Sequence, residues 1–554
     1  MTTPMRLFDR SKHAYKSSQS SILPQRAASP HRSPPPAAPR LLNTLPKRYT
    51  RLAAVIILSI CAVSVYHVFL FTQAKMNAMR KPPLYERYHR YEAELPQHNP
   101  ELPAPEGKDA KFFWASNHVH GSGWGNAMQE LLVLAHLAYV TKRSFVFDNF
   151  TWSYDDELYS EYNGKLIPAR IPLTAMITGP IVGEPWTSAP DVPRAVSKNY
   201  FFERCPEEKR RYIHTDTVND ESIRYDNNIG AQEMFDRWVD YMSKVDDPCV
   251  EIEQDSAQLF SIWLFGSSRI LDIWPTLSKS PAITQFGWSP LIRAAFNANI
   301  HLFQPKSTTA WPRLDWFFPN SLPTLPSSSF NSDLAAPSSP EPAILSPSLL
   351  VLHIRRGDFE HHCQHLANWS SDWNGFNKFP GLPDTFTPPT EGVGWGETSD
   401  ANRDIYTQHC YPDVRQIVER VMDVKREWEA LGGKVLGTDG VLQKVYVMTN
   451  GATGWIKELK AGLMEAYPWD GVASSRDLKL NWEQKYVAQT VDMMIGQRAG
   501  VFIGNGVRNS ASCVILVQLL ISVAVLESDF KCRDAANGEK RISREQPLLV
   551  MALS

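Results

Sequence analysis

Two adjacent arginines follow a histidine at the end of an apolar run, and their side chains suit phosphate chemistry. The run ends in His353, Ile354, Arg355, Arg356, Gly357 and Asp358. Arginine presents a planar fork of N–H donors that matches phosphate oxygens, and a fixed cation stabilises a diphosphate that departs with growing negative charge. Asp358 could orient an arginine or accept from a hydroxyl group of a nucleotide or sugar. The pattern predicts a site for a phosphorylated ligand; a structural ion pair at a strand end is the alternative.

A glycine-rich segment forms the second candidate. It contains Gly123, Gly125 and Asn126 and precedes apolar residues at helical spacing. Glycine has no Cβ, so the backbone can approach a ligand closely. Asn126 could bind phosphate or position a second substrate. Glu130, one helical turn later, is a candidate general base, although a solvated or capping carboxylate is the simpler reading.

The third candidate segment lies further along the chain. Gly504 and Asn505 follow the apolar run 501–503, and Ser510 and Ser512 come shortly afterwards. The two hydroxyl groups could act as hydrogen-bond donors to a ligand. The apolar stretch 513–526 is too short to span a bilayer comfortably, so we interpret it as a buried helix.

These three segments each follow a predicted strand. Short apolar runs at Lys111–Trp114, Ser144–Phe147, 349–354, Lys444–Met448 and 501–503 predict strands, and a helix is predicted from about Trp482 to Gln497. Strands that alternate with helices indicate a doubly wound α/β fold. In such folds ligands bind outside the carboxyl ends of the strands, which is where all three segments lie.

A long apolar stretch near the N-terminus predicts a membrane anchor. Residues 52–71 carry no formal charge, and a helix of that length spans a hydrocarbon core of about 30 Å. Residues 1–51 contain ten Lys or Arg and one acid, Asp9. The positive-inside rule therefore predicts a cytosolic tail and a luminal body, as in a single-pass type II protein.

Two further patterns agree with a luminal body. Asn149 and Asn368 begin glycosylation sequons after the predicted anchor. Six cysteines follow residue 61, and an oxidising lumen would allow them to form disulfides. Six cysteines permit 15 connectivities, which the sequence does not distinguish, although Cys363 and Cys410 are one candidate pair.

Composition divides the chain into seven segments. A Ser- and Pro-rich stretch separates two parts of similar length, and the net charge of −2 does not indicate nucleic-acid binding. The predicted segments are a disordered basic tail (1–51), an anchor (52–71), a stem (72–110), a first Rossmann-like domain (111–318), a linker (319–348), a second Rossmann-like domain (349–526) and a tail without a clear α/β pattern (527–554).

The three segments together resemble the GDP-fucose protein O-fucosyltransferases, which are related to the nodulation and N-glycan core fucosyltransferases. Those families carry a strand ending in His-x-Arg, and Arg355 matches the arginine that binds the GDP diphosphate. Gly123 to Asn126 are similar to their Gly-x-x-Asn loop, and Phe502-Ile503-Gly504 is similar to their Phe-x-Gly segment. After Gly506 the chain departs from the Ser-rich turn expected there.

The resemblance implies two Rossmann-like domains of the GT-B type and an inverting transfer of fucose from GDP-fucose to a hydroxyl of a protein or glycan. It implies catalytic roles for Arg355 and Asn126, with the first domain on the acceptor side. It also implies a membrane location in the Golgi or endoplasmic reticulum. The implied donor-binding residues are His353, Arg355, Arg356, Asp358, Gly123, Gly125, Asn126, Gly504, Asn505, Ser510 and Ser512.

No metal or cofactor is expected. No two aspartates are separated by one residue, so the Asp-x-Asp metal motif of many transferases is lacking from the sequence. The cluster around Cys363, with His361, His362 and His365, fits no common zinc spacing. Two alternatives remain: a transferase of the same fold with another nucleotide sugar, and a catalytically inactive sugar-binding or scaffolding membrane protein.

Overall fold

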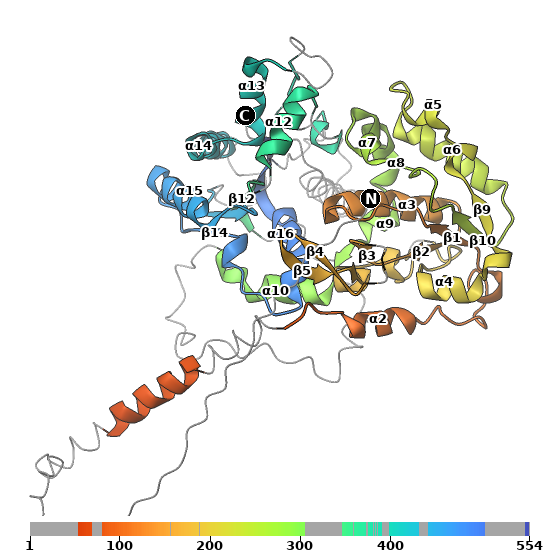
Figure 1. The fold of residues 1–554 in the computed structure, drawn as a ribbon, viewed down its shortest axis with the longest axis horizontal. Helices are drawn as coiled ribbons and strands as arrows, with labels where there is room; N and C mark the ends of the chain where they lie inside the picture. Colours follow the sequence, from red (N-terminus) through yellow and green to blue (C-terminus); the bar gives the residue numbers. More distant parts are fainter. Residues whose placement is uncertain are drawn as a thin grey trace, which may run out of the picture. The chain divides into compact units, whose positions relative to one another are not determined.

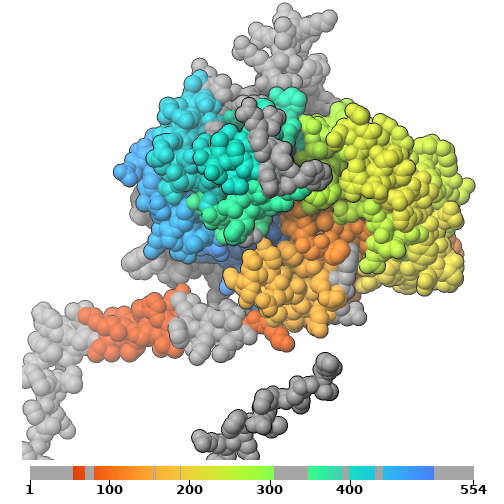
Figure 2. All heavy atoms as spheres, turned by 45° about the horizontal axis from the view of Figure 1, so that its top comes forward, coloured from red at the N-terminus to blue at the C-terminus, as the bar shows by residue number. Residues whose placement is uncertain are grey.

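The computed structural model describes residues 54–68, 80–304, 346–430, 441–504 and 549–552, without Tyr154, Asp156, Ser188, Asp358 and parts of the segment 373–397. The chain divides into two compact units, 1–79 and 80–554. In the first, residues 54–68 are helical and their side chains are exposed (Figure 2). Across the described ranges, no helix combines the length and apolar character needed to cross a bilayer. The predicted anchor extends beyond the described residues at both ends, and the tail 1–51 lies outside them.

A parallel five-stranded sheet organises the first half of the second unit (Figure 1). Its order is β8 (Val196–Ser197), β2 (Ser144–Phe147), β1 (Phe112–Ala115), β10 (Cys249–Ile252) and β9 (Arg211–Ile213). The predicted strand at Ser144–Phe147 is confirmed, and the one predicted at Lys111–Trp114 is shifted by one residue. Both faces of the sheet are apolar because helices cover both of them.

The long helices of this half flank the sheet, and short elements fill the connections (Figure 1). The α-helices are α2 (Glu86–Ala93), α3 (Trp124–Val140), α4 (Lys198–Arg204), α5 (Glu221–Arg224), α6 (Ala231–Ser243), α7 (Ile262–Phe265), α8 (Trp274–Leu277), α9 (Pro281–Thr284) and α10 (Pro290–Ala298). The small strands are β3 (Phe150–Thr151), β4 (Tyr159–Tyr162), β5 (Lys165–Pro168), β6 (Arg170–Ile171), β7 (Ile177–Thr178) and β11 (Gly287–Trp288).

A second parallel sheet organises the rest of the unit. Its order is β14 (Gly471–Ser474), β13 (Lys444–Met448), β12 (Ser346–His353), β15 (Ala499–Gly504) and β16 (Leu549–Ala552). The helices are α12 (Glu360–Asn368), α13 (Asp400–Cys410), α14 (Val414–Ala430), α15 (Thr453–Ala466) and α16 (Ala488–Gln497). Side chains of α14 and α15 pack on one face of this sheet and side chains of α16 on the other. The predicted α/β class with parallel sheets is therefore confirmed.

Three local predictions differ from the structure. The tail after residue 526 contributes β16, which pairs with β15. The helix predicted from Trp482 begins as a 3-10 turn at Gln484–Val487 and becomes α-helical at Ala488. The glycine-rich loop ends earlier than expected, since α3 begins at Trp124. A glycine inside a helix costs about 1 kcal/mol, and burial of the Trp124 side chain offsets that cost.

Contacts between distant segments join the two halves within the second unit. The ring of Phe303 meets Tyr446 edge-on at 5.2 Å. The Asn299 amide group donates to the Lys479 carbonyl at 3.0 Å and accepts from the Lys479 N–H at 2.8 Å. The Arg87 guanidinium forms an ion pair with Glu483. One hydrophobic core cluster contains residues of both halves.

Two disulfides are present in the described part of the chain, Cys205–Cys249 and Cys363–Cys410. The first joins the end of α4 to β10, and the second joins α12 to α13. Cys513 and Cys532 lie outside the described residues. A disulfide-bonded sulfur is not a thiolate ligand, so the zinc reading of the segment around Cys363 loses its cysteine.

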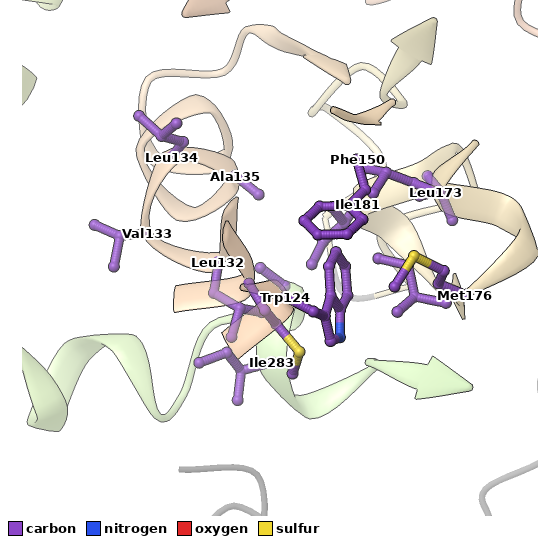
Figure 3. Close-up of a cluster of buried hydrophobic side chains, with 14 of the residues drawn as sticks. Trp124, Leu132, Val133, Leu134, Ala135, Phe150, Leu173, Met176, Ile181 and Ile283 are labelled. Carbon is purple, nitrogen blue, oxygen red and sulfur yellow. The ribbon is translucent and has the colours of Figure 1, made fainter. Parts of the chain in front are cut away.

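Burial of Trp124 yields a stability prediction. Its side chain is 1% exposed and meets the Phe150 ring edge-on at 5.4 Å, with Met176 and Leu173 nearby (Figure 3). Trp124→Ala should lower the free energy of unfolding by about 3–5 kcal/mol, because it leaves a cavity in the core. Trp263→Ala is the matched control, since Trp263 is 73% exposed and its loss should change stability by less than about 0.5 kcal/mol. Urea titration of both variants checks this, and equal losses would contradict it.

Candidate functional site

The first candidate group lies at the carboxyl edge of the second sheet. β12 ends at His353, and the chain turns through Arg355, Arg356 and Gly357 before α12. His353 lies opposite Gly504 in the pairing of β12 with β15, so the first and third sequence motifs meet on neighbouring strands. The His353 ring stacks on Phe502 with centroids 6.4 Å apart. Asp358, Asn505, Ser510 and Ser512 lie outside the described residues.

The two arginines of the turn have different surroundings. The Arg356 guanidinium lies 3.8 Å from the Tyr411 ring centroid and 5.0 Å from that of Trp455, and its Nη1 donates to the Pro412 carbonyl at 2.7 Å. Burial lowers the pKa of Arg356. Its guanidinium is thus held by two aromatic rings and one backbone carbonyl. Arg355 is half-buried, and its guanidinium lies 6.0 Å from the Phe359 ring.

A single side chain fixes the backbone of this turn. The Asn450 Oδ1 atom accepts from the N–H of Arg356 at 2.8 Å and from the N–H of Gly357 at 3.1 Å. Asn450 follows β13, the strand beside β12. The strand at Lys444–Met448 is predictable from the sequence, but the role of Asn450 is not, because nothing in the local pattern shows which backbone amides a side chain will meet.

The loop that carries Asn450 is itself held from β14. The Arg476 guanidinium donates to the Asn450 carbonyl at 3.2 Å, and the Thr449 N–H donates to the Ser475 hydroxyl at 3.0 Å. Ser475 in turn donates to Asp492 Oδ2 at 2.9 Å. Desolvation raises the pKa of Asp492 to about 6, against its hydrogen bonds from Tyr446 and Ser475. This chain of contacts connects α16 to the arginine turn.

The second candidate group lies at the carboxyl edge of the first sheet. The Asn117 amide, just after β1, donates to the Ala257 carbonyl at 2.7 Å and to the Ser256 hydroxyl at 3.2 Å. Thr215, after β9, contacts the same Ser256 hydroxyl at 2.9 Å. The loops that follow three adjacent strands are therefore tied together, and the glycine-rich segment begins from a fixed base.

The glycine-rich segment itself is ordered by the start of α3. Gly123 is the residue that precedes the helix, and open space surrounds the position where a Cβ would stand. Gly125 is buried in the first turn, and its carbonyl accepts from the Gln129 amide at 3.2 Å. The Asn126 side chain donates to Ser122 Oγ at 2.6 Å. Gly123 thus fits the predicted backbone approach to a ligand, and Gly125 faces the interior.

Glu130 is buried, so its interpretation as a solvated or capping residue is wrong. Its side chain lies one turn after Asn126 on α3, is 3% exposed and accepts from the Val119 N–H at 2.5 Å. Burial raises the pKa of Glu130 to about 7, although the Val119 amide and the charge of His118 oppose this. The apolar helix pattern alone did not show that Glu130 lies on the inward face.

A histidine beside Glu130 pairs with an aspartate, which also pairs with a lysine. Asp148, after β2, is 3.5 Å from His118 Nε2 and 2.8 Å from Lys198 Nζ. Burial is the largest effect on the pKa of His118 and lowers it, but the hydrogen bond and charge of Asp148, the charge of Glu130 and the Val119 carbonyl together raise this pKa above its ordinary value. Burial likewise opposes ionisation of Asp148, yet His118 and Lys198 hold its pKa at about 2. None of these three residues belongs to a motif that predicts a site from the sequence.

A cavity of about 40 Å³ connects these polar groups. That volume holds roughly two or three water molecules and is far too small for a nucleotide. Its polar lining consists of His118, Glu130, Asp148 and Asn149, and aromatic side chains form much of the rest. A second cavity of about 10 Å³ is lined by Glu130, Val119 and Asn126, together with residues of the segment 258–265.

The two glycosylation sequons have partly buried asparagines. The Asn149 side chain lines the larger cavity and donates to Asp148, and Thr151 of its sequon is buried. Asn368 is the last residue of α12 and is half-buried. Glycosylation acceptors are surface residues, so a glycan on Asn149 would have to displace the cavity wall. Neither site is tested by these contacts.

Possible metal sites can be identified only among the residues that the structure describes. There, no group of three His, Cys, Asp or Glu side chains is arranged to hold a metal ion. The absence of a metal or cofactor therefore stays a prediction for the protein.

Comparisons with known proteins gave structural matches only. No protein-family model and no curated protein matches the chain. A solved structure of POFUT1 in complex with GDP covers 74% of this chain and 96% of its own, at 14% identity and a TM-score of 0.38. POFUT1 in complex with GDP-fucose covers 75% and 95%, at 15% identity and a TM-score of 0.36. NodZ alpha-1,6-fucosyltransferase soaked with GDP-fucose covers 74% and 92%, at 11% identity and a TM-score of 0.29. Such low scores assign no role to any residue.

The Asn450 contacts yield the first prediction from this site. Asn450→Ala removes the acceptor for two backbone amides, which should cost about 1–3 kcal/mol of stability and loosen the arginine turn. Asn450→Asp keeps an acceptor oxygen at the same place and should lose much less. Thermal unfolding measures the cost, and hydrogen exchange at the Gly357 amide reports the turn directly. Equal protection of that amide in the wild type and Asn450→Ala would contradict the role given to Asn450.

Glu130 yields a prediction about pH. Its pKa rises on folding from about 4.5 to about 7, so the folded state binds more protons than the unfolded state between these values. Stability must then fall as pH rises through this window, by about 3 kcal/mol from this group. Glu130→Gln cannot ionise, so its unfolding free energy should fall less between pH 5 and pH 8. Parallel pH curves for wild type and variant would contradict burial of an ionisable group here.

Proposed function

We propose that the chain is a glycosyltransferase that takes a sugar from a GDP-sugar, GDP-fucose in the first place, and transfers it to a hydroxyl group of a protein or glycan. The observation that carries the proposal is the arginine turn after β12, which Asn450 holds at the carboxyl edge of a parallel sheet. That edge is where ligands of open α/β sheets bind. The choice of GDP-fucose follows from the motif resemblance of this turn and of the glycine-rich segment.

In the proposed reaction the acceptor hydroxyl attacks the anomeric carbon from the face opposite the diphosphate. Arg355 offers its planar fork to the departing diphosphate and stabilises the charge that develops there. Asn450 binds the backbone amides of the two residues that follow Arg355. Arg355 therefore needs little reorganisation when charge develops on the diphosphate. From the first half, Gly123 would let the backbone approach the donor, and Asn126 would bind phosphate or help to position the acceptor.

We further propose that residues 52–71 anchor the protein in a Golgi or endoplasmic-reticulum membrane, with the body in the lumen. The uncharged stretch and its basic N-terminal flank support this topology. The two disulfides in the body also fit an oxidising compartment better than the cytosol.

Replacement of Arg355 tests the donor site. Arg355→Ala should lower turnover of GDP-fucose by about 10²–10³ and abolish thermal stabilisation by GDP, with little change in the melting temperature without ligand. Arg355→Lys should also be impaired, since lysine keeps the charge but lacks the planar fork. Differential scanning fluorimetry with and without GDP, and measurement of GDP release, provide the readouts.

Replacement of the adjacent Arg356 provides a comparison with Arg355→Ala. The Arg356 guanidinium is held between Tyr411 and Trp455 and bonds to Pro412, so Arg356→Ala should melt earlier. Arg415→Ala, in the exposed part of α14, should change neither property. An Arg355→Ala protein that melts much earlier yet is still stabilised by GDP would show that Arg355 is structural and would overturn the donor assignment.

A further inference from the structure

Glu130 occupies the junction of the two cavities at the first sheet. It lines both of them, and so does Val119, whose amide it binds. Asn126 lines the smaller cavity and lies four residues earlier on α3, which places both side chains on one face of the helix. The smaller cavity thus leads from the proposed acceptor side to a buried carboxyl group.

Among the described residues, one oxygen of the Glu130 carboxyl group accepts a hydrogen bond and the other does not. Oε2 accepts from the Val119 N–H, and no other described residue forms a hydrogen bond with this side chain. A buried carboxylate with one hydrogen bond costs stability once it ionises. Glutamine would make the same contact without that cost, so the contact with Val119 does not by itself account for an acid at this position.

The larger cavity has a polar lining that protein groups leave unsatisfied. Within the described residues, the buried Nε1 atoms of Trp114 and Trp124 and the Oδ1 atom of Asn149 have no hydrogen-bond partner. All three residues line the cavity beside Glu130. Buried polar atoms of this kind are usually satisfied by internal water, and about 40 Å³ has room for roughly two or three molecules.

We propose that Glu130 is the general base of the transfer reaction and accepts the proton of the acceptor hydroxyl through one water molecule in the smaller cavity. That cavity of about 10 Å³ holds about one water, and transfer through a single water is within the reach of a general base. The proposal rests on the proposed function.

The step balances. The acceptor oxygen forms a bond to the anomeric carbon, and the bond from that carbon to the diphosphate breaks. The bonding electrons leave with GDP, and the hydroxyl proton passes to Glu130. The waters of the larger cavity provide a path by which the protonated carboxyl group can release this proton.

The surroundings of Glu130 suit a base that works near neutral pH. Burial raises its pKa to about 7, and His118 is the charged neighbour that lowers it; Asp148 and Lys198 lie behind His118. On the other side, the smaller cavity is lined by the uncharged Gln258, Phe260, Ile262 and Phe265. Of the elements that pack on α3, β2 and α9 carry no charged residue, and the charged residues of α6 are exposed. The ionised, active form should therefore accumulate as pH rises from 6 to 8.

The test uses hydrolysis of GDP-fucose, in which water replaces the unidentified acceptor, and follows GDP release by the full chain. Wild-type turnover should rise with pH through about pH 7 and level off above about pH 8. Glu130→Gln should lower turnover by about 10²–10⁴ and abolish this rise, while GDP still raises its melting temperature as in the wild type. Glu92→Gln is the matched control, since burial also raises the pKa of Glu92 to about 7 but its carboxyl group bonds to Thr174 and lines neither cavity.

The outcomes separate the two proposals. Wild-type rate and pH dependence in Glu130→Gln would overturn the role of Glu130 and leave the proposed function intact. A wild-type protein that neither binds GDP nor hydrolyses GDP-fucose would overturn the proposed function and the base with it. If Glu130→Gln fails to fold, Glu130→Asp serves instead: its carboxyl group is set back by one methylene, so it should lose most turnover while it keeps GDP stabilisation. Full turnover in that variant would count against the proposal.

Discussion

The arginine turn after β12, where we propose that the donor binds, depends on the two hydrogen bonds from the amides of Arg356 and Gly357 to the Asn450 side chain. A turn after a strand has few backbone partners of its own, and an arginine on a loose turn would lose much of its electrostatic effect to reorganisation. The side chain of Asn450 supplies the missing acceptor from the neighbouring strand. Arg476, Ser475 and, beneath them, Asp492 then hold the loop of Asn450.

At the carboxyl edge of the first sheet, the loops are fixed in a different way. The loops after β1, β10 and β9 are held by neutral side chains, with Asn117, Thr215 and Ser256 in mutual contact. Beside them lie acids in contrasting states. His118 and Lys198 lower the pKa of Asp148 to about 2, whereas burial raises the pKa of Glu130 to about 7. Two carboxyl groups whose surroundings push their pKa values apart are a common feature of acid–base sites.

These polar arrangements cost stability that the apolar core must offset. The helix that carries Asn126 and Glu130 is buried over much of its length and packs against Phe150, Met176 and Ile283 through residues of its first turns (Figure 3). The core that surrounds α3 includes residues of both halves. A site that contains a buried acid can persist because the helix under it is held on several sides.

Local sequence determined the strands and the class of fold. The runs at Ser144–Phe147 and Lys444–Met448 are apolar on both faces, which is sufficient to predict buried parallel strands, and the motifs follow them directly. By the same reasoning Arg355 and Gly504 were expected at one sheet edge, and β12 and β15 are indeed neighbours. These predictions succeed because the apolar side chains of a strand indicate by themselves that the strand is buried.

The tertiary structure alone decided which groups meet and which are buried. Asn450 lies 94 residues from Arg356, so no local pattern shows that its amide holds the arginine turn. Glu130 sits in a mostly apolar helix, and only the packing of the loops at 116–123 and 258–265 over α3 encloses its carboxyl group. Desolvation and hydrogen bonding depend on atoms brought together from distant parts of the chain. The pKa values, and the contacts that hold the site in place, could therefore not be predicted from the sequence.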